Sequence, residues 1–495
     1  MPRLLERRGA WRGCTFAAIV AWAWIALPGA AAAQDPKAVV EAASKAMGVE
    51  TLTSITYSGS AAQGNFGQSR TISFGLASTA IRNYTRTFDF TQPASHATGD
   101  ATPPAVAGGP RPQSRPYEQF VTPATPAWSQ QLQIWVTPWG FLRGAAANGA
   151  TMRTRKISNV PYKLVTWVPP QKAPSGQAYK VVGYVNPENL VDRVETWVEH
   201  PVFGDMHIEV TYSDFRDMGG FRVPVRISQK QVGMETFVVA ITQAGVNPSN
   251  LAELMTPTLA PGPAPTGAAT APATPPVASE RLAEGVYRIT GGYVAMAVEF
   301  RDHVVVLEGG QNEARGLAIL AETKRLFPTK RIKYVVNTHP HFDHAGGLAP
   351  FVAEGVTIIG DDNSKFFTEQ ALSSPRTLVG DALGKARKKA KVEGVIEKMV
   401  LKDDTRTLEL HHVEKLEHSD AMLIAYLPKE RILFTADFNV PGPGQPVSPS
   451  IATLVQNIER LQLDFDRHVT VHAPSPDRPL TKADLLALAH RGTQP

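Results

Sequence analysis

Cysteine is almost absent from this chain, because Cys14 is its one cysteine among 495 residues. After residue 33 the chain therefore has no disulfide and no thiolate for a metal. Any metal site has to use histidine nitrogen and carboxylate oxygen. A large excess of one sign of charge is lacking as well, since 50 lysines and arginines are balanced by 45 aspartates and glutamates. A balance this even argues against nucleic acid as a partner.

Long hydrophobic runs are also lacking after an apolar stretch near the start. Arginines occur within residues 1–12, an apolar run covers 16–26, and three alanines end the segment at 31–33. This order is typical of a cleaved export signal, and an uncleaved anchor is the alternative. Pro28 breaks the run, which is short for a membrane span. The sequence thus predicts a signal peptide over 1–33, a periplasmic or secreted protein, and no stable membrane span in the mature chain.

Residues 34–250 carry short or alternating apolar segments, the pattern of β-strands. One helix is expected over 36–47. Strands are expected over 51–59, 69–75, 132–136, 179–185, 190–198, 206–212, 221–228 and 236–243. Because no helices separate these strands, the pattern predicts a mainly antiparallel β domain, curved or shaped as a half-barrel. Residues 92–126 are rich in Pro, Gly, Ala, Thr and Ser and are expected to have little fixed structure.

The segments 212–215 and 219–224 resemble parts of the lipoprotein-carrier-like β modules found in exported bacterial proteins. Seven prolines then fall among alanine, threonine and glycine in residues 256–279. Such a tract favours extended chain over a packed core, so it separates two domains. We therefore predict a β-rich N-terminal domain over 34–250, a linker over 251–279 and a second domain over 280–495.

Strands and helices alternate after residue 280, which predicts an α/β domain with helices covering a sheet. Strands are expected over 286–289, 295–300, 303–307, 332–337, 356–360, 408–412, 422–426, 432–435 and 468–472. Helices are expected over 313–326, 346–354, 363–399 with a break at Pro375, 451–461 and 482–490. The basic stretch 385–391 is favoured as a solvated helix face over a lid for an anionic substrate.

The residues most suited to chemistry are His-Pro-His-Phe-Asp-His at 339–344, directly after an expected strand. Histidines and an aspartate gathered in one loop are costly unless something compensates them, and a divalent metal accounts for all four. Past a strand end, residues two apart can point the same way. His339 and His341 can therefore bind one ion while Asp343 and His344 turn toward a second. Two glycines at 346–347 permit close backbone approach where a helix begins.

This stretch matches the H-x-H-x-D-H signature of the metallo-β-lactamase superfamily, and later segments resemble that family too. His418 opens a segment that leads to a strand ending in Ala436-Asp437, where the family usually has Gly-Asp. His472 lies at a strand end near the C-terminus, without the family's flanking glycines. The resemblance implies an αββα sandwich for residues 280–495.

The resemblance also implies a binuclear metal site and assigns its residues. The first metal would be bound by His339, His341 and His418, the second by Asp343, His344 and His472, with Asp437 bridging both. Nitrogen and oxygen ligands with open positions suit two zinc ions per chain, and iron or manganese are alternatives because no sulfur selects zinc.

Three further roles are expected around that site. Asp343 would also be catalytic, orienting the attacking hydroxide and passing a proton. Glu308 corresponds to the carboxylate of an Asp-x-Gly turn that orients the histidine loop in the family. His411 and His412 are expected to pack or support the site rather than to bind metal, and His468 is a poorer ligand candidate than His472 because it begins its strand.

These features predict an exported metal-dependent hydrolase, in which hydroxide held by two zinc ions attacks the carbonyl of an ester, lactone or lactam. A carboxylate at 437 resembles glyoxalase II-like, lactonase-like and phosphodiesterase-like members more than β-lactamases, which favours esters and lactones. Two alternatives stay open: a persulfide-dioxygenase-like iron enzyme, and a periplasmic ligand-binding protein with a vestigial metal domain. The expected partner is a small-molecule substrate, and the oligomeric state is open.

Overall fold

The computed structural model describes residues 35–72, 75–105, 111–122, 127–259, 276–441, 445–475 and 477–492. The predicted signal peptide and most of the predicted linker lie outside these residues, so the domain boundaries stay predictions. Residues 36–495 cluster into one unit. Among the described residues, no helix has the length and apolar character needed to cross a membrane.

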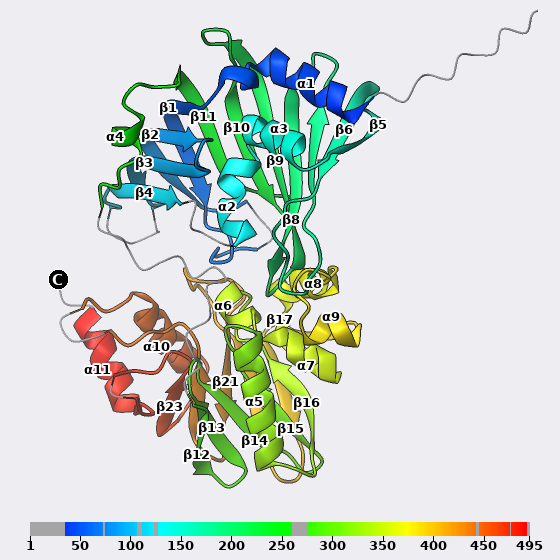
Figure 1. Ribbon diagram of the computed structural model, residues 1–495. Helices are drawn as coiled ribbons and strands as arrows, with labels where there is room; N and C mark the ends of the chain where they lie inside the picture. Colours follow the sequence, from blue (N-terminus) through cyan, green and yellow to red (C-terminus); the bar gives the residue numbers. More distant parts are fainter. Residues whose placement is uncertain are drawn as a thin grey trace, which may run out of the picture. The chain divides into compact units, whose positions relative to one another are not determined.

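An 11-stranded antiparallel sheet forms the N-terminal region (Figure 1), as the strand pattern predicts. Its strands follow the order β4-β3-β2-β1-β11-β10-β9-β8-β7-β6-β5. They are β1 Ser54–Gly64, β2 Ser78–Asp89, β3 Ala94–Thr102, β4 Arg115–Val121, β5 Thr151–Ile157, β6 Val160–Trp167, β7 Val181–Val185, β8 Val191–His200, β9 Gly204–Asp217, β10 Arg222–Gln231 and β11 Met234–Val246.

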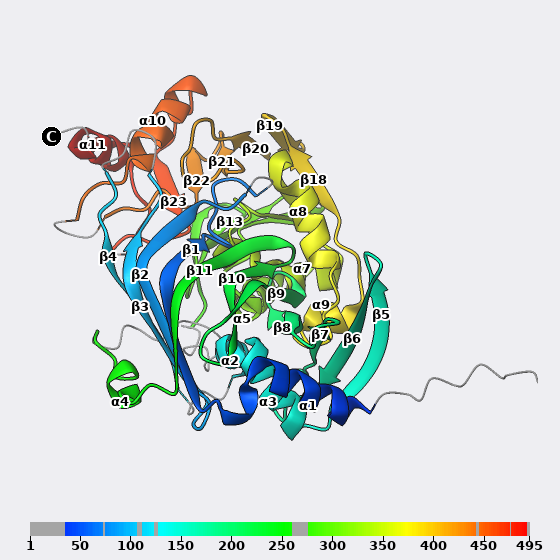
Figure 2. The same ribbon diagram turned by 90° about the horizontal axis from the view of Figure 1, so that it is seen from above.

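Helices pack on the inner side of this curved sheet (Figure 2). They are α1 Pro36–Met47, α2 Trp128–Trp135 and α3 Pro138–Ala147, while the short α4 Leu251–Leu254 follows the last strand. Helix α2 contacts β3, β4 and β8, although β8 is far from β3 and β4 in the sheet order. The sheet therefore curls around the helices, and their large apolar side chains, such as Trp128, Trp139 and Phe141, are fully buried in its core.

Three expectations for the N-terminal region are wrong. Residues 132–136 belong to α2 and its C-terminal end. Trp128, Leu132 and Trp135 follow helical spacing, and the alternation of Leu132 and Ile134 that suggests a strand is coincidental. Residues 92–126 contain two strands, β3 and β4, because pairing of β3 with β2 and of β4 with β3 overrides their low β-propensity. The described part of 69–75 is not a strand.

The C-terminal region contains two mixed sheets. The first has the order β12-β13-β14-β15-β16-β17-β18 and the second the order β19-β20-β21-β22-β23. The strands are β12 Ala278–Ala283, β13 Val286–Thr290, β14 Ala295–Glu299, β15 His303–Leu307, β16 Arg331–Val336, β17 Thr357–Asp361, β18 Val392–Val395, β19 Lys398–Lys402, β20 Thr407–His412, β21 Leu423–Leu427, β22 Ile432–Thr435 and β23 Arg467–Thr470.

Helices cover the outer faces of both sheets, which gives the αββα order (Figure 1). The helices are α5 Glu313–Leu326, α6 Phe342–Ala345, α7 Leu348–Glu354, α8 Asp362–Ser373, α9 Ala382–Ala386, α10 Ser450–Arg460 and α11 Lys482–Gly492. Strand β15 shows the layering, since Val304 and Val306 pack with the α5 and α7 side while Val305 and Leu307 pack with the second sheet. Both of its faces are buried, as in other sheets between two layers.

The expected helical stretch 363–399 is correct only in its first part. After α8 and α9 the chain forms β18, which pairs in parallel with β17, and then β19. Lysine and glutamate give this segment high helix propensity. Pairing along the open edge of the first sheet overrides that local preference.

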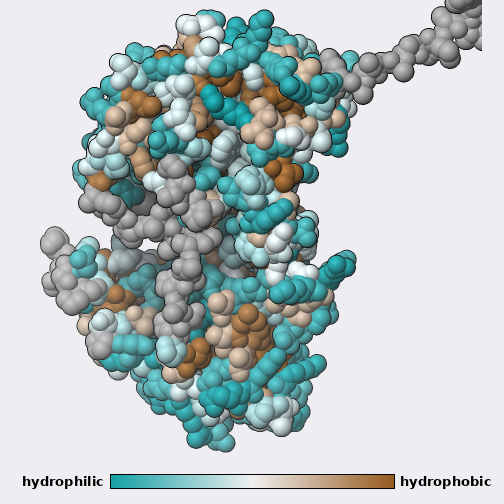
Figure 3. All heavy atoms as spheres, in the orientation of Figure 1, coloured by the Kyte–Doolittle hydropathy of each residue, from teal (hydrophilic) through white to brown (hydrophobic). Residues whose placement is uncertain are grey.

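The molecular surface is mainly hydrophilic on the face drawn in Figure 3, where apolar side chains form separate patches. Among the described residues, Phe366 and Ile396 are the large apolar side chains with the greatest exposure, 77% and 74%. The other large apolar side chains are mostly interior, as expected for a well-packed core.

Candidate metal centre

Strand ends bring the candidate ligands to one place. The loop after β16 and the short α6 carry His339, His341, Asp343 and His344. Strands β22 and β23 pair in parallel, so the residues that follow them reach the same edge of the second sheet. Asp437 and His472 follow these two strands, and His418 precedes β21. The structure thus brings together all seven side chains that the sequence predicts as ligands.

The first group consists of three histidines and one aspartate. His339 Nε2 lies 3.0 Å from His341 Nδ1 and 3.3 Å from His418 Nε2. His418 Nε2 lies 2.8 Å from Asp437 Oδ2. Nitrogens bound tetrahedrally to one zinc ion at about 2.0 Å are separated by about 3.3 Å. These spacings suit ligands around one ion.

The second group shares Asp437 with the first. His344 Nε2 and His472 Nε2 each lie 2.9 Å from Asp437 Oδ1. Asp343 Oδ2 lies 3.7 Å from His344 Nε2. Asp437 therefore presents Oδ2 to the first group and Oδ1 to the second, as a bridging carboxylate would.

Two buried atoms in this cluster make no hydrogen bond of acceptable geometry: His344 Nε2 and Asp437 Oδ1. His339 and His344 are fully buried, and unsatisfied polar atoms in such a place are costly. One divalent cation in the second group would satisfy these two atoms, and another in the first group would satisfy the facing nitrogens of His339 and His341. The residues therefore fit a pair of metal ions. They form two candidate metal-binding groups that are typical of a binuclear metallo-β-lactamase site.

Burial and neighbouring charges determine the protonation of the histidines. Burial, reinforced by His418, lowers the pKa of His341 to about 4, so its ring is neutral, the form that binds metal. Burial alone would lower the pKa of His344, but the carboxylates of Glu308 and Asp437 raise it to about 10. Burial alone would raise the pKa of Asp437, and its histidine neighbours hold it well below its usual range.

Glu308 lies directly behind His344 and is fully buried. Its Oε2 accepts a hydrogen bond from Thr338 Oγ1 (2.8 Å) and lies 3.1 Å from His344 Nδ1. Its Oε1 accepts from the backbone amides of Gly309 and Gly310. Because Nδ1 of His344 donates to Glu308, Nε2 is left to face the second group. Glutamate thus occupies the place where the family resemblance leads us to expect an aspartate.

Three residues that the sequence analysis did not single out also contact the cluster. Tyr293 Oη donates to Asp343 Oδ2 (2.8 Å), and Gln68 Nε2 donates to Asp343 Oδ1 (2.6 Å). His341 Nε2 donates to the Ser69 carbonyl (3.0 Å), which leaves Nδ1 of that ring for metal. Burial and Asp343 raise the pKa of Tyr293, so its hydroxyl stays protonated. All three come from segments far from 339–344, and no motif marks them.

The remaining histidines have other partners. His411 Nε2 pairs with Glu409, and His412 Nδ1 lies 2.6 Å from Asp361 Oδ2. His468 Nε2 lies 2.8 Å from Thr435 Oγ1. None of them belongs to the two candidate groups found among the described residues.

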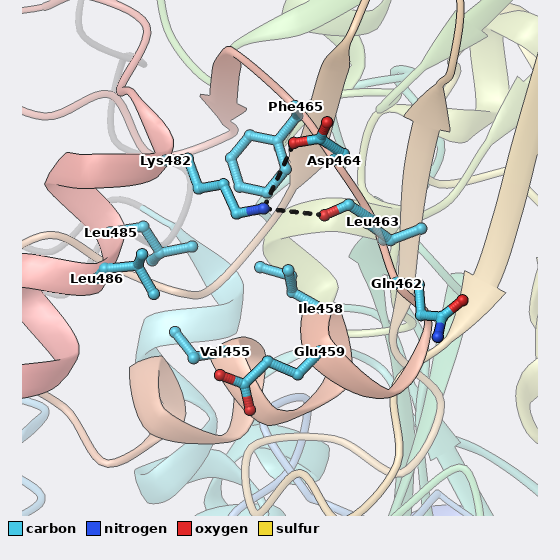
Figure 4. A pocket seen from close by; sticks show the side chains of 10 residues that line it. All are labelled: Val455, Ile458, Glu459, Gln462, Leu463, Asp464, Phe465, Lys482, Leu485 and Leu486. Atoms are coloured by element: carbon cyan, nitrogen blue, oxygen red, sulfur yellow. Dashed lines mark hydrogen bonds and ion pairs between the residues drawn. The ribbon is translucent and has the colours of Figure 1, made fainter.

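A cavity of about 330 Å³ lies between α10 and α11 (Figure 4). Lys482 Nζ crosses it to the Leu463 carbonyl and to Asp464 Oδ1, each at 3.5 Å. Apolar side chains such as Leu485 form its other walls. None of the seven candidate ligands lines this cavity, so it is separate from the metal centre.

Comparison with known proteins gives relatives of the C-terminal region. One curated relative is the 2,4-dinitroanisole O-demethylase subunit alpha of Nocardioides sp. (strain JS1661), 23% identical over 207 residues. The match covers 40% of this chain and 58% of the relative, so this chain spans less than two thirds of that protein's length.

Solved metallo-β-lactamases are similar at low identity. The enzyme from Pontibacter korlensis is 15% identical with a TM-score of 0.35, covering 44% of this chain and 100% of its own. The enzyme from Hirschia baltica is 19% identical with a TM-score of 0.32, covering 44% of this chain and 98% of its own.

The sequence model of the metallo-β-lactamase superfamily matches residues 290–473. All seven candidate ligands fall inside that range, and the αββα order of layers agrees with it. Residues 290–473 are therefore a metallo-β-lactamase superfamily domain, an enzyme fold with a candidate metal site, preceded by a β-rich N-terminal region.

Proposed function

We propose that this protein is a metal-dependent hydrolase of small carbonyl substrates. The observation that supports this most is the sharing of Asp437 between two groups of metal-ligating side chains. Two zinc ions held there would polarise a carbonyl and activate the water that attacks it. Nitrogen and oxygen donors suit zinc, and they also suit iron or manganese.

In this proposal His339, His341 and His418 hold the first ion, and His344 and His472 hold the second together with Asp343 and Asp437. Glu308 fixes which nitrogen of His344 is available. Tyr293 fixes the carboxylate of Asp343.

Asp343 is the residue that we propose to be catalytic. Its side chain is 33% exposed, against 7% for Asp437, so it is the more accessible carboxylate of the cluster. The neighbouring His344, Tyr293 and Gln68 outweigh burial, which alone would raise the pKa of Asp343, and keep its carboxylate ionised at neutral pH. An ionised carboxylate in this place can orient the attacking water.

Esters and lactones are the substrate class that we favour. The side chains in hydrogen-bond contact with Asp343 and His344 are those of Tyr293, Gln68 and Glu308, and none of the three is a cation. A phosphodiester needs positive charge to hold its phosphate, whereas a carbonyl does not. The carboxylate at 437 favours esters and lactones over β-lactams through the family resemblance.

A substrate panel tests this proposal on the zinc-loaded protein. The panel holds a lactone, an aryl ester, a thioester, a β-lactam, a phosphodiester and, because of the curated relative's name, a nitroaryl methyl ether. We expect ester or lactone hydrolysis to be fastest and to be lost with a chelator and in His339→Ala. Turnover of the phosphodiester alone would overturn the substrate class, and oxygen consumption by an iron-loaded protein would favour the dioxygenase alternative.

Export is a further part of the proposal. The basic, apolar and small-residue regions of residues 1–33 support it. A mature protein that begins near residue 34, found outside the cytoplasm, is the expected result of intact-mass analysis and fractionation.

A further inference from the structure

We propose that the N-terminal β region forms part of the active site through residues 65–70, here called the 65–70 loop. In this proposal the loop fixes the two ligand-bearing segments of the metallo-β-lactamase domain, and Gln68 positions Asp343. The inference rests on the proposed metal-dependent function. In this inference the β-rich region takes part in the reaction by supporting the metal ligands, and it is not a functionally separate domain.

Three backbone carbonyls of the loop bind the ligand-bearing segments. Gly67 accepts from the Phe342 amide (3.1 Å), and Ser69 accepts from His341 Nε2 (3.0 Å). Arg70 accepts from the amide of Asp420, two residues after His418 (2.9 Å). A single stretch of four residues thus links segments 339–344 and 418–420. Both segments supply ligands to the first group.

Gln68 reaches the second group from the same loop. Its Nε2 donates to Asp343 Oδ1 at 2.6 Å, while Tyr293 of the C-terminal domain donates to Oδ2. With a donor on each oxygen, the carboxylate cannot rotate without losing a hydrogen bond. Hydrogen bonds of this kind around a metal ligand preserve its orientation and affinity. We therefore assign Gln68 as a positioning residue.

Aromatic packing holds the loop in this place. Phe66 meets Phe342 edge to face at 4.9 Å between ring centroids and stacks on Phe203 at 5.8 Å. Gly67 has a φ of +89°, and a Cβ atom there would lie 2.2 Å from Phe342 Cδ2. The 65–70 loop therefore approaches segment 339–344 so closely that residue 67 has to be glycine.

The test measures zinc binding by the full-length protein, so it does not depend on the substrate. Wild type, Gln68→Ala and Gln68→Met are titrated with zinc against a competing chelator. Gln92→Ala is the matched control, because Gln92 is an exposed glutamine of the same region. We expect two tight sites in wild type and the control. In Gln68→Ala one of the two should weaken by roughly tenfold.

Gln68→Met separates hydrogen bonding from packing. It keeps the length of the side chain without a charge or a donor hydrogen, so the same site should weaken as in Gln68→Ala. Gly67→Val, which displaces the whole loop, should weaken both sites. Thermal unfolding of the zinc-free variants checks that each is folded.

The outcomes separate this inference from the proposed function. Two unchanged tight sites in both Gln68 variants would overturn the role of Gln68 and leave the hydrolase proposal intact. Weakening in the alanine variant with wild-type affinity in the methionine variant would overturn the hydrogen-bond mechanism. A wild-type protein that binds no divalent metal would overturn both proposals.

Discussion

Asp437 joins the two halves of the candidate metal centre through its two oxygens. Oδ2 lies 2.8 Å from His418 Nε2, and Oδ1 lies 2.9 Å from both His344 Nε2 and His472 Nε2. His418, in contrast, contributes to the first group alone. Truncating these two side chains should therefore have different effects on metal content.

Asp437→Ala should remove both zinc ions together, whereas His418→Ala should leave about one ion per chain. The reason is that the aspartate is a ligand in both groups and the histidine in one. Elemental analysis of the purified variants measures this directly, with Asp404→Ala, an exposed aspartate of the same domain, as the control. Equal and mild losses in the two variants would show that Asp437 is not the bridge.

At the residue scale, the sequence predicts the seven candidate ligands because their spacing is local or matches a known order along the chain. The sequence does not predict that Gln68, Ser69 and Tyr293 belong to the site. Ser69 acts through its backbone carbonyl, which any residue type supplies. Gln68 lies 275 positions before the aspartate that it contacts. Long-range contacts of this kind carry no periodicity or spacing that a single sequence reveals.

At the element scale, the turn between β8 and β9 forms a second contact with the C-terminal domain. Arg376, in the segment after α8, donates to the carbonyls of Pro201 and Val202 and pairs with Asp381. Arg376 and Asp381 are only 7% and 3% exposed. Asp205 at the start of β9 accepts from the amides of Thr377 and Leu378. The turn is therefore fixed by hydrogen bonds from the Arg376 guanidinium, which a buried ion pair with Asp381 orients, and by those that Asp205 accepts.

Arg376→Ala should lower the free energy of unfolding by about 3–5 kcal/mol, because it leaves the Asp381 carboxylate buried without its partner. Urea denaturation of the full-length protein measures the change. Arg325→Ala is the matched control, since Arg325 pairs with Glu322 at the surface and should contribute about 0–1 kcal/mol. A loss for Arg376→Ala no larger than that of the control would contradict the prediction.

Elements with a strong local pattern are those that the sequence predicts best. Helix 313–326 is found with the predicted bounds, and its N-cap Asn312 accepts a hydrogen bond from the amide of Arg315. Strand β18 is missed because it consists of four residues and forms by pairing with β17. Its stability comes from pairing with β17 at the edge of the first sheet. The local sequence of β18 does not indicate that this edge is available.

At the scale of the whole molecule, one buried histidine bears on acid stability. His468 on β23 is completely buried, and its Nδ1 has no hydrogen-bond partner. Burial lowers its pKa from 6.5 to about 4. Between these pH values the unfolded chain binds a proton at this residue and the folded protein does not. The contribution of the neutral, buried His468 to folding stability is therefore complete above pH 6.5 and is lost as the pH falls toward 4.

His468→Gln should reduce the loss of stability between pH 6.5 and 4 by up to about 3 kcal/mol, because glutamine does not titrate. Its amide can still bond to Thr435, the partner of His468. Urea denaturation of both proteins at a series of pH values gives the two slopes. Parallel curves would mean that His468 is protonated in the folded protein as readily as in the unfolded chain.

Among the residues that the structure describes, the open N-terminal sheet has two free edges, β4 and β5, at its opposite ends (Figure 2). An unpaired strand edge is a template for aggregation with another chain. Strand β5 carries the exposed cations Arg153, Arg155 and Lys156, which repel a second copy of the same edge. Strand β4 begins with Arg115 and Pro116, and proline has no amide hydrogen to offer an incoming strand. Both edges thus resist the intermolecular pairing that leads to fibrils, so a half-barrel that never closes can persist at high concentration.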